Sequence, residues 1–499
     1  MSKRPHLIIF NPDQWRGDVM GHLDNPAAVT PNLDQIIEND AVSFRQAFCQ
    51  NPVCTPSRCS FMTGWYPHVR GHRTMFHMLQ PDEPVLLKYL KDNGYFVWWG
   101  GKNDLVPRQN GFAEYCDVKY EAPRELRPNL HRADEWRGDP AGDNYYSFYA
   151  GKLPSASLDP PEASGGSVTE GVYYDNDWAM VDGAVDLIQN APGDQPLCIY
   201  LPLGYPHPPY GVEDPWYSRI ERDRIPARIP SPDWSKKPSL VAGIYERQGL
   251  QGWSEERFTE LRATYYGMCA RVDAQFGMLV EALRESGIYD DSAIFFFSDH
   301  GDFTGDYGLV EKTQNTFEDC LTRVPLIVKP PADVPIEPGV RDQLVELIDF
   351  TATAYEWAGI EPDYDHFGRS LTALIGGAAD EHRDAVFCEG GRRLAEEQAM
   401  EKDSPSFYDP AGLYWPRVQL QGSEDGEHSK ATMCRSRDFK YVRRLYETDE
   451  LYDLRLDPGE GDNRIDDPAY AEILSDLRER MLTWYQTTCD VVPYKTDRR

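Results

Sequence analysis

Four short segments carry side chains that can do chemistry, and two of these segments offer ligands for a metal ion. Asp13-Gln14 follows an apolar run with a carboxylate and an amide, and Asp299-His300 follows another with a carboxylate and an imidazole. Hard oxygens and imidazole nitrogens are the ligands that divalent cations take in proteins. We therefore take Asp13, Gln14, Asp299 and His300 as candidate metal ligands. Helix caps and turns use the same residue types and are the alternative.

The third segment is Cys54-Thr55-Pro56-Ser57-Arg58. Proline suits the first turn of a helix and Gly64 suits its end, so Cys54 is predicted at a helix N-terminus. The helix dipole there stabilises negative charge and is expected to lower the pKa of the thiol. A buried, inert cysteine is one alternative. A zinc site is another, although histidines at finger spacing are missing; its ligands would be Cys49, Cys54 and Cys59.

The fourth group is a set of basic side chains: Arg58, Lys102, His207 and Lys312. A single lysine is usually a solvated surface group. Lys102, His207 and Lys312, however, each lie just past a different predicted strand. Because the carboxyl ends of parallel strands meet at one edge of a sheet, these three side chains are expected to share a cleft. Such a cleft would bind an anion.

Alternating short apolar runs and helical patterns predict the fold that must position these residues. Strands are predicted at 7–10, 95–99, 197–203, 293–297 and 326–328, all nearly continuous in apolar residues, as strands buried on both faces are. Helices are predicted from Pro31, with Thr30 as the cap, at 86–93, from Ser254 to near Gly287, and at 349–358. The alternation indicates an α/β fold with a large, mixed, mostly parallel central sheet flanked by helices.

Two stretches, 120–170 and 205–253, are rich in turn-forming or aromatic residues and are predicted to be long surface loops that carry binding function. After about residue 375 the pattern changes to strands at 385–389 and 439–445 and a helix at 469–485. We therefore expect two domains, a catalytic α/β domain over 1–375 and a small α+β domain over 376–499.

The overall charge limits the partners of the protein. Asp and Glu number 82 against 51 Lys and Arg, giving a net charge of −31, which disfavours nucleic acid and anionic membranes. The start of the chain has no apolar run long enough for a signal sequence, so a cytoplasmic location is expected, with a secreted chain trimmed of its signal as the alternative. A homo-oligomer is left open.

The same motifs, in this order, resemble the type I sulfatases of the alkaline phosphatase superfamily. Cys54-Thr55-Pro56-Ser57-Arg58 matches their Cys-x-Pro-x-Arg signature, and Ser298-Asp299-His300-Gly301-Asp302 is similar to their second metal motif. Segments similar to the family's also occur at 30–34, 305–306, 323–326, 450–454 and 457–460, so that the resemblance spans nearly the whole chain.

The resemblance implies an alkaline phosphatase-like fold and a mechanism. A dedicated formylglycine-generating enzyme would oxidise Cys54 in the nascent chain, and the hydrated aldehyde would attack the sulfur of a small anionic sulfate ester to give a sulfo-enzyme intermediate. Asp13, Gln14, Asp299 and His300 would bind the cation together with the modified Cys54. Ca²⁺ is favoured by the oxygen-rich ligand set, with Mg²⁺ or Mn²⁺ behind it. The other implied roles fall to basic residues: Arg58 holds the hydrate, Lys102 and Lys312 neutralise the sulfate, and His207 contacts the leaving side.

Three departures from the family pattern concern the substrate. Asp13-Gln14 replaces the common Asp-Asp and resembles choline sulfatases and phosphonate monoester hydrolases. Asp104 stands where many members have a histidine, which leaves His207 as the better proton donor for the leaving group. His72 and Arg73 belong to a segment of different form and, with Asp104, are candidate substrate-binding residues, or part of a surface loop. A carbohydrate sulfate is the preferred substrate, a phosphonate monoester or phosphodiester the alternative, and a non-catalytic anion-binding relative the third hypothesis.

Overall fold

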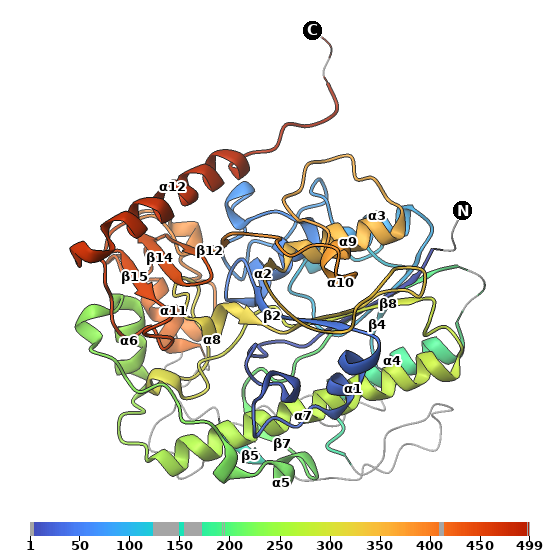
Figure 1. Ribbon diagram of the computed structural model, residues 1–499, viewed down its shortest axis with the longest axis horizontal. Helices are drawn as coiled ribbons and strands as arrows, with labels where there is room; N and C mark the ends of the chain where they lie inside the picture. The colour runs from blue at the N-terminus through green and yellow to red at the C-terminus, as the bar shows by residue number, and fades with distance from the viewer. Residues whose placement is uncertain are drawn as a thin grey trace.

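The computed structural model describes residues 4–122, 149–153, 172–191, 193, 195–408, 414–496 and 498. A mixed nine-stranded sheet lies at its centre (Figure 1). Its strands run in the order β11 (Gly339–Glu346), β2 (Val42–Phe48), β10 (Leu326–Lys329), β8 (Ser292–Phe297), β1 (His6–Asn11), β6 (Leu197–Pro202), β3 (Phe96–Gly100) and β4 (Val118–Tyr120), and β9 (Arg323–Val324) pairs with β2.

The pairing confirms the predicted mostly parallel sheet. β1 is parallel to both of its neighbours, β6 and β8, and β3 is parallel to β4 and β6. The antiparallel pairs involve β10, which pairs with β2 and β8, and the short β9. The five predicted strands correspond to β1, β3, β6, β8 and β10.

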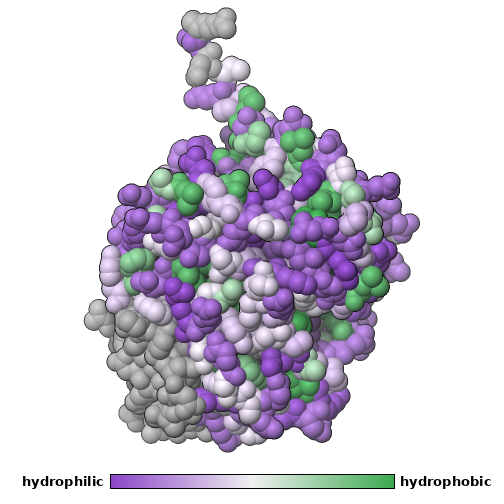
Figure 2. All heavy atoms as spheres, turned by 90° about the vertical axis from the view of Figure 1, so that its left-hand side faces the viewer, coloured by the Kyte–Doolittle hydropathy of each residue, from purple (hydrophilic) through white to green (hydrophobic). Residues whose placement is uncertain are grey.

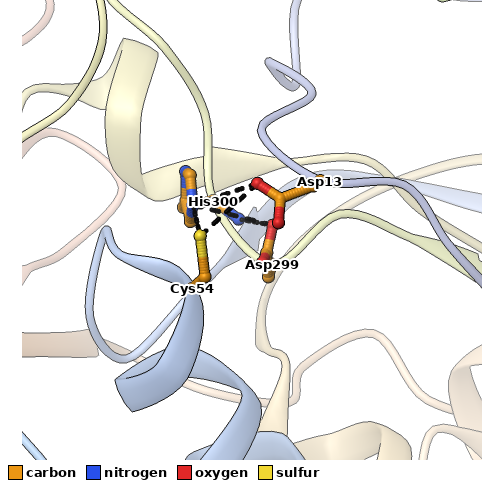
Figure 3. Close-up of side chains that lie close together, drawn as sticks. All are labelled: Asp13, Cys54, Asp299 and His300. Carbon is orange, nitrogen blue, oxygen red and sulfur yellow. Dashed lines mark hydrogen bonds and ion pairs between the residues drawn. The ribbon is translucent and has the colours of Figure 1, made fainter. Parts of the chain in front are cut away.

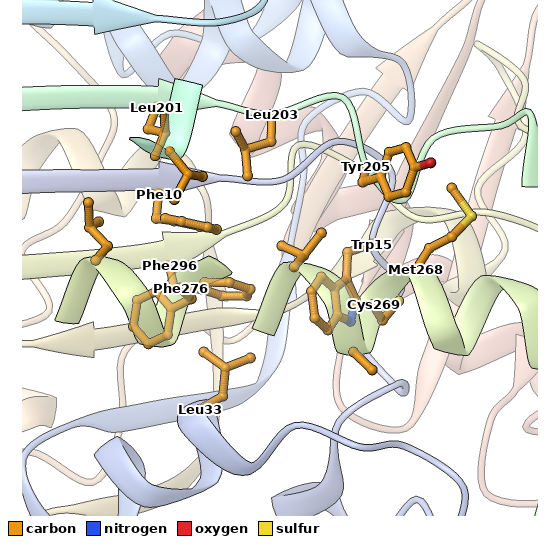
Figure 4. Packing of buried hydrophobic residues seen from close by; sticks show 14 of the residues in the cluster. Phe10, Trp15, Leu33, Leu201, Leu203, Tyr205, Met268, Cys269, Phe276 and Phe296 are labelled. Carbon is orange, nitrogen blue, oxygen red and sulfur yellow. The ribbon is translucent and has the colours of Figure 1, made fainter. Parts of the chain in front are cut away.

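Side chains of the central strands alternate between two hydrophobic layers, as a strand's period of two requires. Ile8 and Phe10 of β1 face the layer under α1 (Pro31–Asn39), α4 (Asn176–Gln189) and α7 (Glu255–Glu285), whereas Leu7 and Ile9 face the opposite layer. That opposite layer contains α2 (Cys54–Thr63), α3 (Leu86–Asp92) and α9 (Ile348–Ala358), and α10 (Thr372–Ile375) lies on the same side (Figure 1). Figure 4 shows the first layer, where the Phe10 ring packs 5.4 Å from that of Phe276 on α7.

The start of α1 corrects one prediction. Thr30 does precede the helix, but its side chain caps no backbone N–H. Its hydroxyl instead accepts from Gly21 N at 2.9 Å and donates to Asp34. The N–H groups of the first turn are bound by Asp273 of α7, which accepts from Leu33 N at 2.9 Å. A helix end needs an acceptor for these groups, and here it comes from a distant part of the sequence.

A second, antiparallel sheet forms the C-terminal part of the chain (Figure 1). Its strands are β12 (Val386–Gly390), β13 (Ala431–Arg435), β14 (Phe439–Arg444) and β15 (Glu450–Asp453), and α12 (Ala471–Thr488) packs on it through Trp484. The small α+β part predicted from the sequence is thus confirmed as a fold. The boundary at residue 375 stays a prediction. The two parts also share packing across it, because Phe48 of β2 and Val386 of β12 belong to one hydrophobic cluster.

The two predicted loop regions differ in outcome. Most of 120–170 lies outside the described residues. The region 205–253 is more ordered than a loop: it contains β7 (Tyr210–Val212), which pairs with β5 (Tyr149–Lys152), as well as α5 (Trp216–Arg219) and α6 (Ser239–Gln248). Hydrophilic residues cover most of the face shown in Figure 2, with hydrophobic ones scattered among them. None of the helices in the described ranges has the length and hydrophobicity to cross a membrane.

Candidate active site

The candidate metal ligands come together at the carboxyl ends of two adjacent strands. Asp13 follows β1, Asp299 and His300 follow β8, and Cys54 is the first residue of α2 (Figure 3). One ligand atom from each of these four buried residues lies within 4.8 Å of the others. The geometry predicted from strand ends is therefore present, with Cys54 beside it.

Hydrogen bonds between the two strand ends fix this arrangement. Asn11 Nδ2 donates to the Phe297 carbonyl at 2.8 Å, and Trp15 N donates to Ser298 Oγ at 2.7 Å. Gly301 is required by close packing, because a Cβ there would lie 2.0 Å from the carbonyl oxygen of residue 320. The loop after β8 can therefore approach the neighbouring backbone only with a glycine at this position.

Arg58 neutralises the two carboxylates of the cluster. It lies one turn along α2 from Cys54, is fully buried, and donates to Asp299 Oδ2 at 2.9 Å and to Asp13 Oδ2 at 3.0 Å. Its guanidinium also donates to the Tyr200 hydroxyl on β6, at 3.3 Å. Burial alone would raise the pKa of Asp13, but Lys102 and Arg58 hold it well below its usual range. Asp13 is therefore ionised and able to bind a cation.

Lys102 reaches the cluster from the end of β3. Its Nζ lies 2.6 Å from Asp13 Oδ2, 2.9 Å from Asp104 Oδ2 and 3.5 Å from Cys54 Sγ. The turn before Lys102 depends on Gly101, which has φ +91°. Any other residue there would have its Cβ 2.2 Å from the Pro202 carbonyl oxygen. Burial would lower the pKa of Lys102, but Asp104 and Asp13 keep it well above the usual value, so the ammonium is charged.

Lys312 and Gln14 form a second pair at the site. Lys312 is 2 % exposed, and its Nζ donates to Gln14 Oε1 at 2.6 Å and lies 2.9 Å from Glu311 Oε1. Gln14 Nε2 donates to Asp302. The amide oxygen proposed as a metal ligand is thus the acceptor for a lysine here, and its role in metal binding stays a prediction.

His207 lies close enough to Lys312 and Asp13 to feel their charges, and its ring nitrogens are engaged by other groups. Its Nδ1 lies 2.6 Å from the Pro208 carbonyl oxygen, and its Nε2 lies 3.0 Å from the hydroxyl of Tyr414. Burial and the nearby charge of Lys312 hold the pKa of His207 well below its usual value, against the opposing effect of Asp13. The ring is therefore neutral.

The expected low pKa of the Cys54 thiol is wrong. Burial, and after it the carboxylate of Asp13, raise the pKa of Cys54 to about 12, and the charges of Lys102 and Lys312 do not compensate. The helix N-terminus is present, but its favourable dipole acts on a group that has lost its water. As an unmodified thiol, Cys54 would be protonated and a poor nucleophile.

The donor set fits a divalent cation. His300 Nδ1 is held by the Gly301 carbonyl at 2.9 Å, so that Nε2 presents its lone pair to the cluster, 3.2 Å from Cys54 Sγ. A metal-binding histidine is commonly oriented in this way through its other ring nitrogen. With Asp13 and Asp299 supplying anionic oxygens, the set favours an ion that accepts oxygen ligands.

Comparison with known proteins decides the family. The model of the family described as Sulfatase matches residues 5–360. The chain belongs to the sulfatase family. It is accordingly a sulfuric ester hydrolase with an alkaline phosphatase-like fold.

Three similar proteins show the range of this family and fold. The chain is 25% identical to the multifunctional alkaline phosphatase superfamily protein PehA of Trinickia caryophylli, over 98% of this chain and 96% of that protein. It is 25% identical to the choline-sulfatase of Rhizobium meliloti, over 93% and 83%. The crystal structure of the phosphonate monoester hydrolase of Agrobacterium radiobacter superimposes with a TM-score of 0.75 at 21% identity, covering 97% of this chain and 96% of that one.

Two candidate substrate residues of this sulfatase are engaged elsewhere. His72 lies 3.0 Å from Glu83 Oε1 through its Nε2, and Arg73 donates to Glu396 Oε1 at 2.9 Å. Asp104 does reach the site, through Lys102. The substrate-binding role of all three stays a prediction.

The zinc alternative gains no support from the positions of the other cysteines. Among the described residues, the one group able to hold a metal contains Cys54 but neither Cys49 nor Cys59. Cys49 Sγ instead lies 3.9 Å from the Leu321 carbonyl oxygen.

Sequence reasoning missed two tyrosines of the sulfatase site. Tyr200 is part of a strand that is otherwise apolar, and counting side chains along that strand could have placed it on the Arg58 face. Tyr414 lies far along the chain, in no motif and beside no predicted strand, and the sequence held no signal for it.

Proposed function

We propose that this sulfatase hydrolyses a sulfate monoester through a nucleophile made by oxidising Cys54 to formylglycine. The observation that carries the proposal is the place of Cys54: the first residue of α2, among Asp13, Asp299 and His300, with Lys102 Nζ 3.5 Å from its sulfur. A thiol held protonated in this position is not itself a useful nucleophile. An oxygen nucleophile in its place would lie against both the cation ligands and the lysine.

The chain's own residues would divide the remaining work. Asp13, Asp299, His300 and Gln14 would hold a divalent cation, for which we favour Ca²⁺ over Mg²⁺ or Mn²⁺ on the oxygen ligands. Such a cation would supply Lewis-acid chemistry at the site, lowering the pKa of a hydroxyl beside it and polarising sulfate oxygens. Arg58 would keep Asp13 and Asp299 in place through its two hydrogen bonds.

Lys102 and Lys312 would neutralise the sulfate group. Both ammonium groups are charged, and their fields act on Cys54. In the transition state negative charge grows on the sulfuryl and departing oxygens, and cations fixed in a water-poor site stabilise that charge more than the ground state. This local positive charge would offset, at the site, the repulsion of an anionic ester by a chain of net charge −31.

The alcohol portion of the ester would occupy a cavity beside the Lys102 turn. The cavity has a volume of about 660 Å³, and its lining includes Gly101 and Asn103 on either side of Lys102, together with the aromatic rings of Phe76 and Phe112. Aromatic rings with polar neighbours suit a ring such as a sugar, which supports a carbohydrate sulfate as the substrate.

The test is mass spectrometry of the peptide that contains Cys54, with activity measured on the same sample. Conversion of the thiol to the aldehyde lowers the mass by about 18 Da, and covalent catalysis needs that group. We expect activity on sulfate esters to rise in proportion to the converted fraction and to vanish in Cys54→Ala. Full activity of a sample that carries only the thiol would refute the proposal.

A phosphonate monoester or phosphodiester hydrolase is the second candidate. The observation in its favour is Gln14, which removes one negative charge from the usual Asp-Asp pair. One similar structure is named a phosphonate monoester hydrolase, and one similar protein is named a multifunctional alkaline phosphatase superfamily protein. Rates on matched 4-nitrophenyl sulfate and 4-nitrophenyl phosphonate esters separate the two. A higher kcat/KM for the phosphonate would establish the second candidate.

A further inference from the structure

Tyr414 enters the site from outside the central sheet. It directly precedes α11 (Trp415–Gln421), in the C-terminal part of the chain, and its hydroxyl lies 3.0 Å from His207 Nε2. The two rings meet edge to face, with centroids 6.1 Å apart. The Lys312 ammonium lies 5.8 Å from the centre of the tyrosine ring. Tyr414 therefore contacts both His207 and Lys312, two residues expected to touch the substrate.

The hydrogen bonds of His207 show which group carries the proton between the two rings. A carbonyl oxygen only accepts, so the 2.6 Å contact between Nδ1 and the Pro208 carbonyl requires the hydrogen on Nδ1. A neutral imidazole has a single N–H, and Nε2 is then an acceptor. The hydroxyl of Tyr414 is accordingly the donor in its bond to His207.

This assignment changes the role that His207 can play. Burial and Lys312 keep the ring neutral, so that Nε2 has no proton to give to a leaving group. The transferable proton of the pair is that of the Tyr414 hydroxyl. Burial raises the pKa of Tyr414 to about 12; the charge of Lys312 acts to lower it, Glu311 raises it, and Lys102 lowers it more weakly, so that the two lysines would stabilise a phenolate. A weak acid of this kind suits an alkoxide, which is a stronger base than a phenolate.

We infer that Tyr414 protonates the departing oxygen of the ester and that His207 is a positioning residue that orients the Tyr414 hydroxyl. The inference rests on the proposed function. As the S–O bond to the alcohol breaks, its electron pair stays on the oxygen and the phenolic proton moves to it, which releases the free alcohol. The hydrated formylglycine of the proposed mechanism loses one proton as its hydroxyl forms the new O–S bond and a second as the aldehyde re-forms and sulfate leaves. One of these protons restores the Tyr414 hydroxyl, the other leaves with the sulfate product or the solvent, and a water molecule rehydrates the aldehyde.

The experiment compares Tyr414→Phe with the wild type on two esters. One is an alkyl sulfate, whose alkoxide needs a proton to leave, and the other is 4-nitrophenyl sulfate, whose phenolate leaves without one. Loss of a general acid typically costs about 10²–10⁴-fold, so kcat on the alkyl ester should fall by about 10² or more. On 4-nitrophenyl sulfate it should change little. Equal losses on both esters would show a structural role and overturn the inference.

Two controls make the comparison specific. Tyr408→Phe removes the hydroxyl of a tyrosine that is 75 % exposed in the same part of the chain, and it should leave both rates unchanged. Inhibition by inorganic sulfate should be the same in Tyr414→Phe and the wild type, because the lysines hold the sulfate. A large rise in the inhibition constant would place Tyr414 in sulfate binding instead and overturn its role as the acid.

His207→Gln tests the pair from the other side. The glutamine oxygen can still accept the Tyr414 hydrogen but has no ionisable proton, so this variant should keep a rate on the alkyl ester at least tenfold above that of Tyr414→Phe. A loss on the alkyl ester as large as that of Tyr414→Phe, with 4-nitrophenyl sulfate spared, would make His207 the acid. A wild type inactive on both esters would refute the proposed function itself, whereas an active wild type with uniform loss in Tyr414→Phe refutes this inference alone.

Discussion

Replacing Lys312 by alanine removes a buried, positively charged side chain from the site. Lys312 is 2 % exposed, donates to Gln14 Oε1 at 2.6 Å and pairs with Glu311 at 2.9 Å. Burial would lower the pKa of Lys312, but Cys54 and Glu311 keep it above its usual value, so that the ammonium stays charged throughout any assay range. Losing one preorganised charge-stabilising group costs about 10²–10³ in rate, or about 2.7–4 kcal/mol of transition-state stabilisation. We expect kcat/KM of Lys312→Ala to fall by that factor.

The same substitution also affects the folded state, and the assay must separate the two effects. Removing one partner of a buried ion pair costs about 3–5 kcal/mol when no other partner remains. Arg417 lies 3.7 Å from Glu311, so the loss of stability should be smaller than that. Rates are therefore measured well below the midpoint of thermal unfolding.

Lys236→Ala, at an exposed position, is the matched control for Lys312→Ala and should behave as the wild type. The rates of both variants are compared at low and moderate ionic strength. Screening the negative surface should leave capture of an anionic ester unchanged or faster. A Lys312→Ala variant within threefold of the wild type would show that this lysine does not act on the substrate.

Three further predictions follow from the geometry. Asp13→Asn and Asp299→Asn should each lower both the amount of bound metal, measured by elemental analysis, and the activity. Full metal occupancy in both variants would show that these two residues are not metal ligands. Gly101→Ala should lower both activity and stability, because the added Cβ would lie 2.2 Å from a carbonyl oxygen. Gly111→Ala is the control, since Gly111 also has a positive φ but has open space around it, and this variant should lose far less of either. Equal effects of the two substitutions would contradict the steric argument. Asp349→Asn should destabilise the protein by about 3 kcal/mol at pH 7. Ion pairing holds the folded pKa of Asp349 below the unfolded 3.8 despite burial. The stabilisation by the ionised Asp349 is therefore present above pH 4 and lost as pH falls through the folded pKa. If urea unfolding gave the same difference in stability between Asp349→Asn and the wild type at pH 7 and below pH 3, this reasoning would be wrong.

The sequence predicted the parts of the site that lie next to strong local signals. Asp13 and His300 each follow a wholly apolar run, and a parallel sheet brings the carboxyl ends of such strands together. Cys54 lies between a helix-starting proline and a helix-ending glycine. In all these cases the residue's neighbours in the chain determine where its side chain lies.

What the sequence did not predict depends on contacts between distant segments. Asp273 rather than Thr30 binds the first turn of α1, and Tyr414 reaches His207 across 207 positions of the chain. The pKa of Cys54 was wrongly predicted because the helix terminus is visible in the sequence, whereas complete burial and the nearby Asp13 are not. Propensities and motifs describe local preferences, and tertiary packing decides such cases.

Because Cys54 is buried in the folded protein, an enzyme that modifies it would have to act before the chain folds around it. In the folded protein Cys54 is 1 % exposed and contacts His300, a residue that is synthesised 246 positions later. At a typical 5–20 residues per second, the ribosome needs roughly 12–50 s to make that stretch. During this interval the cysteine is on the growing chain, and the segment after β8 that contains His300 has not yet been made. If Cys54 is oxidised to formylglycine as we propose, the converted fraction should therefore depend on the rate of translation, and slower translation should raise it.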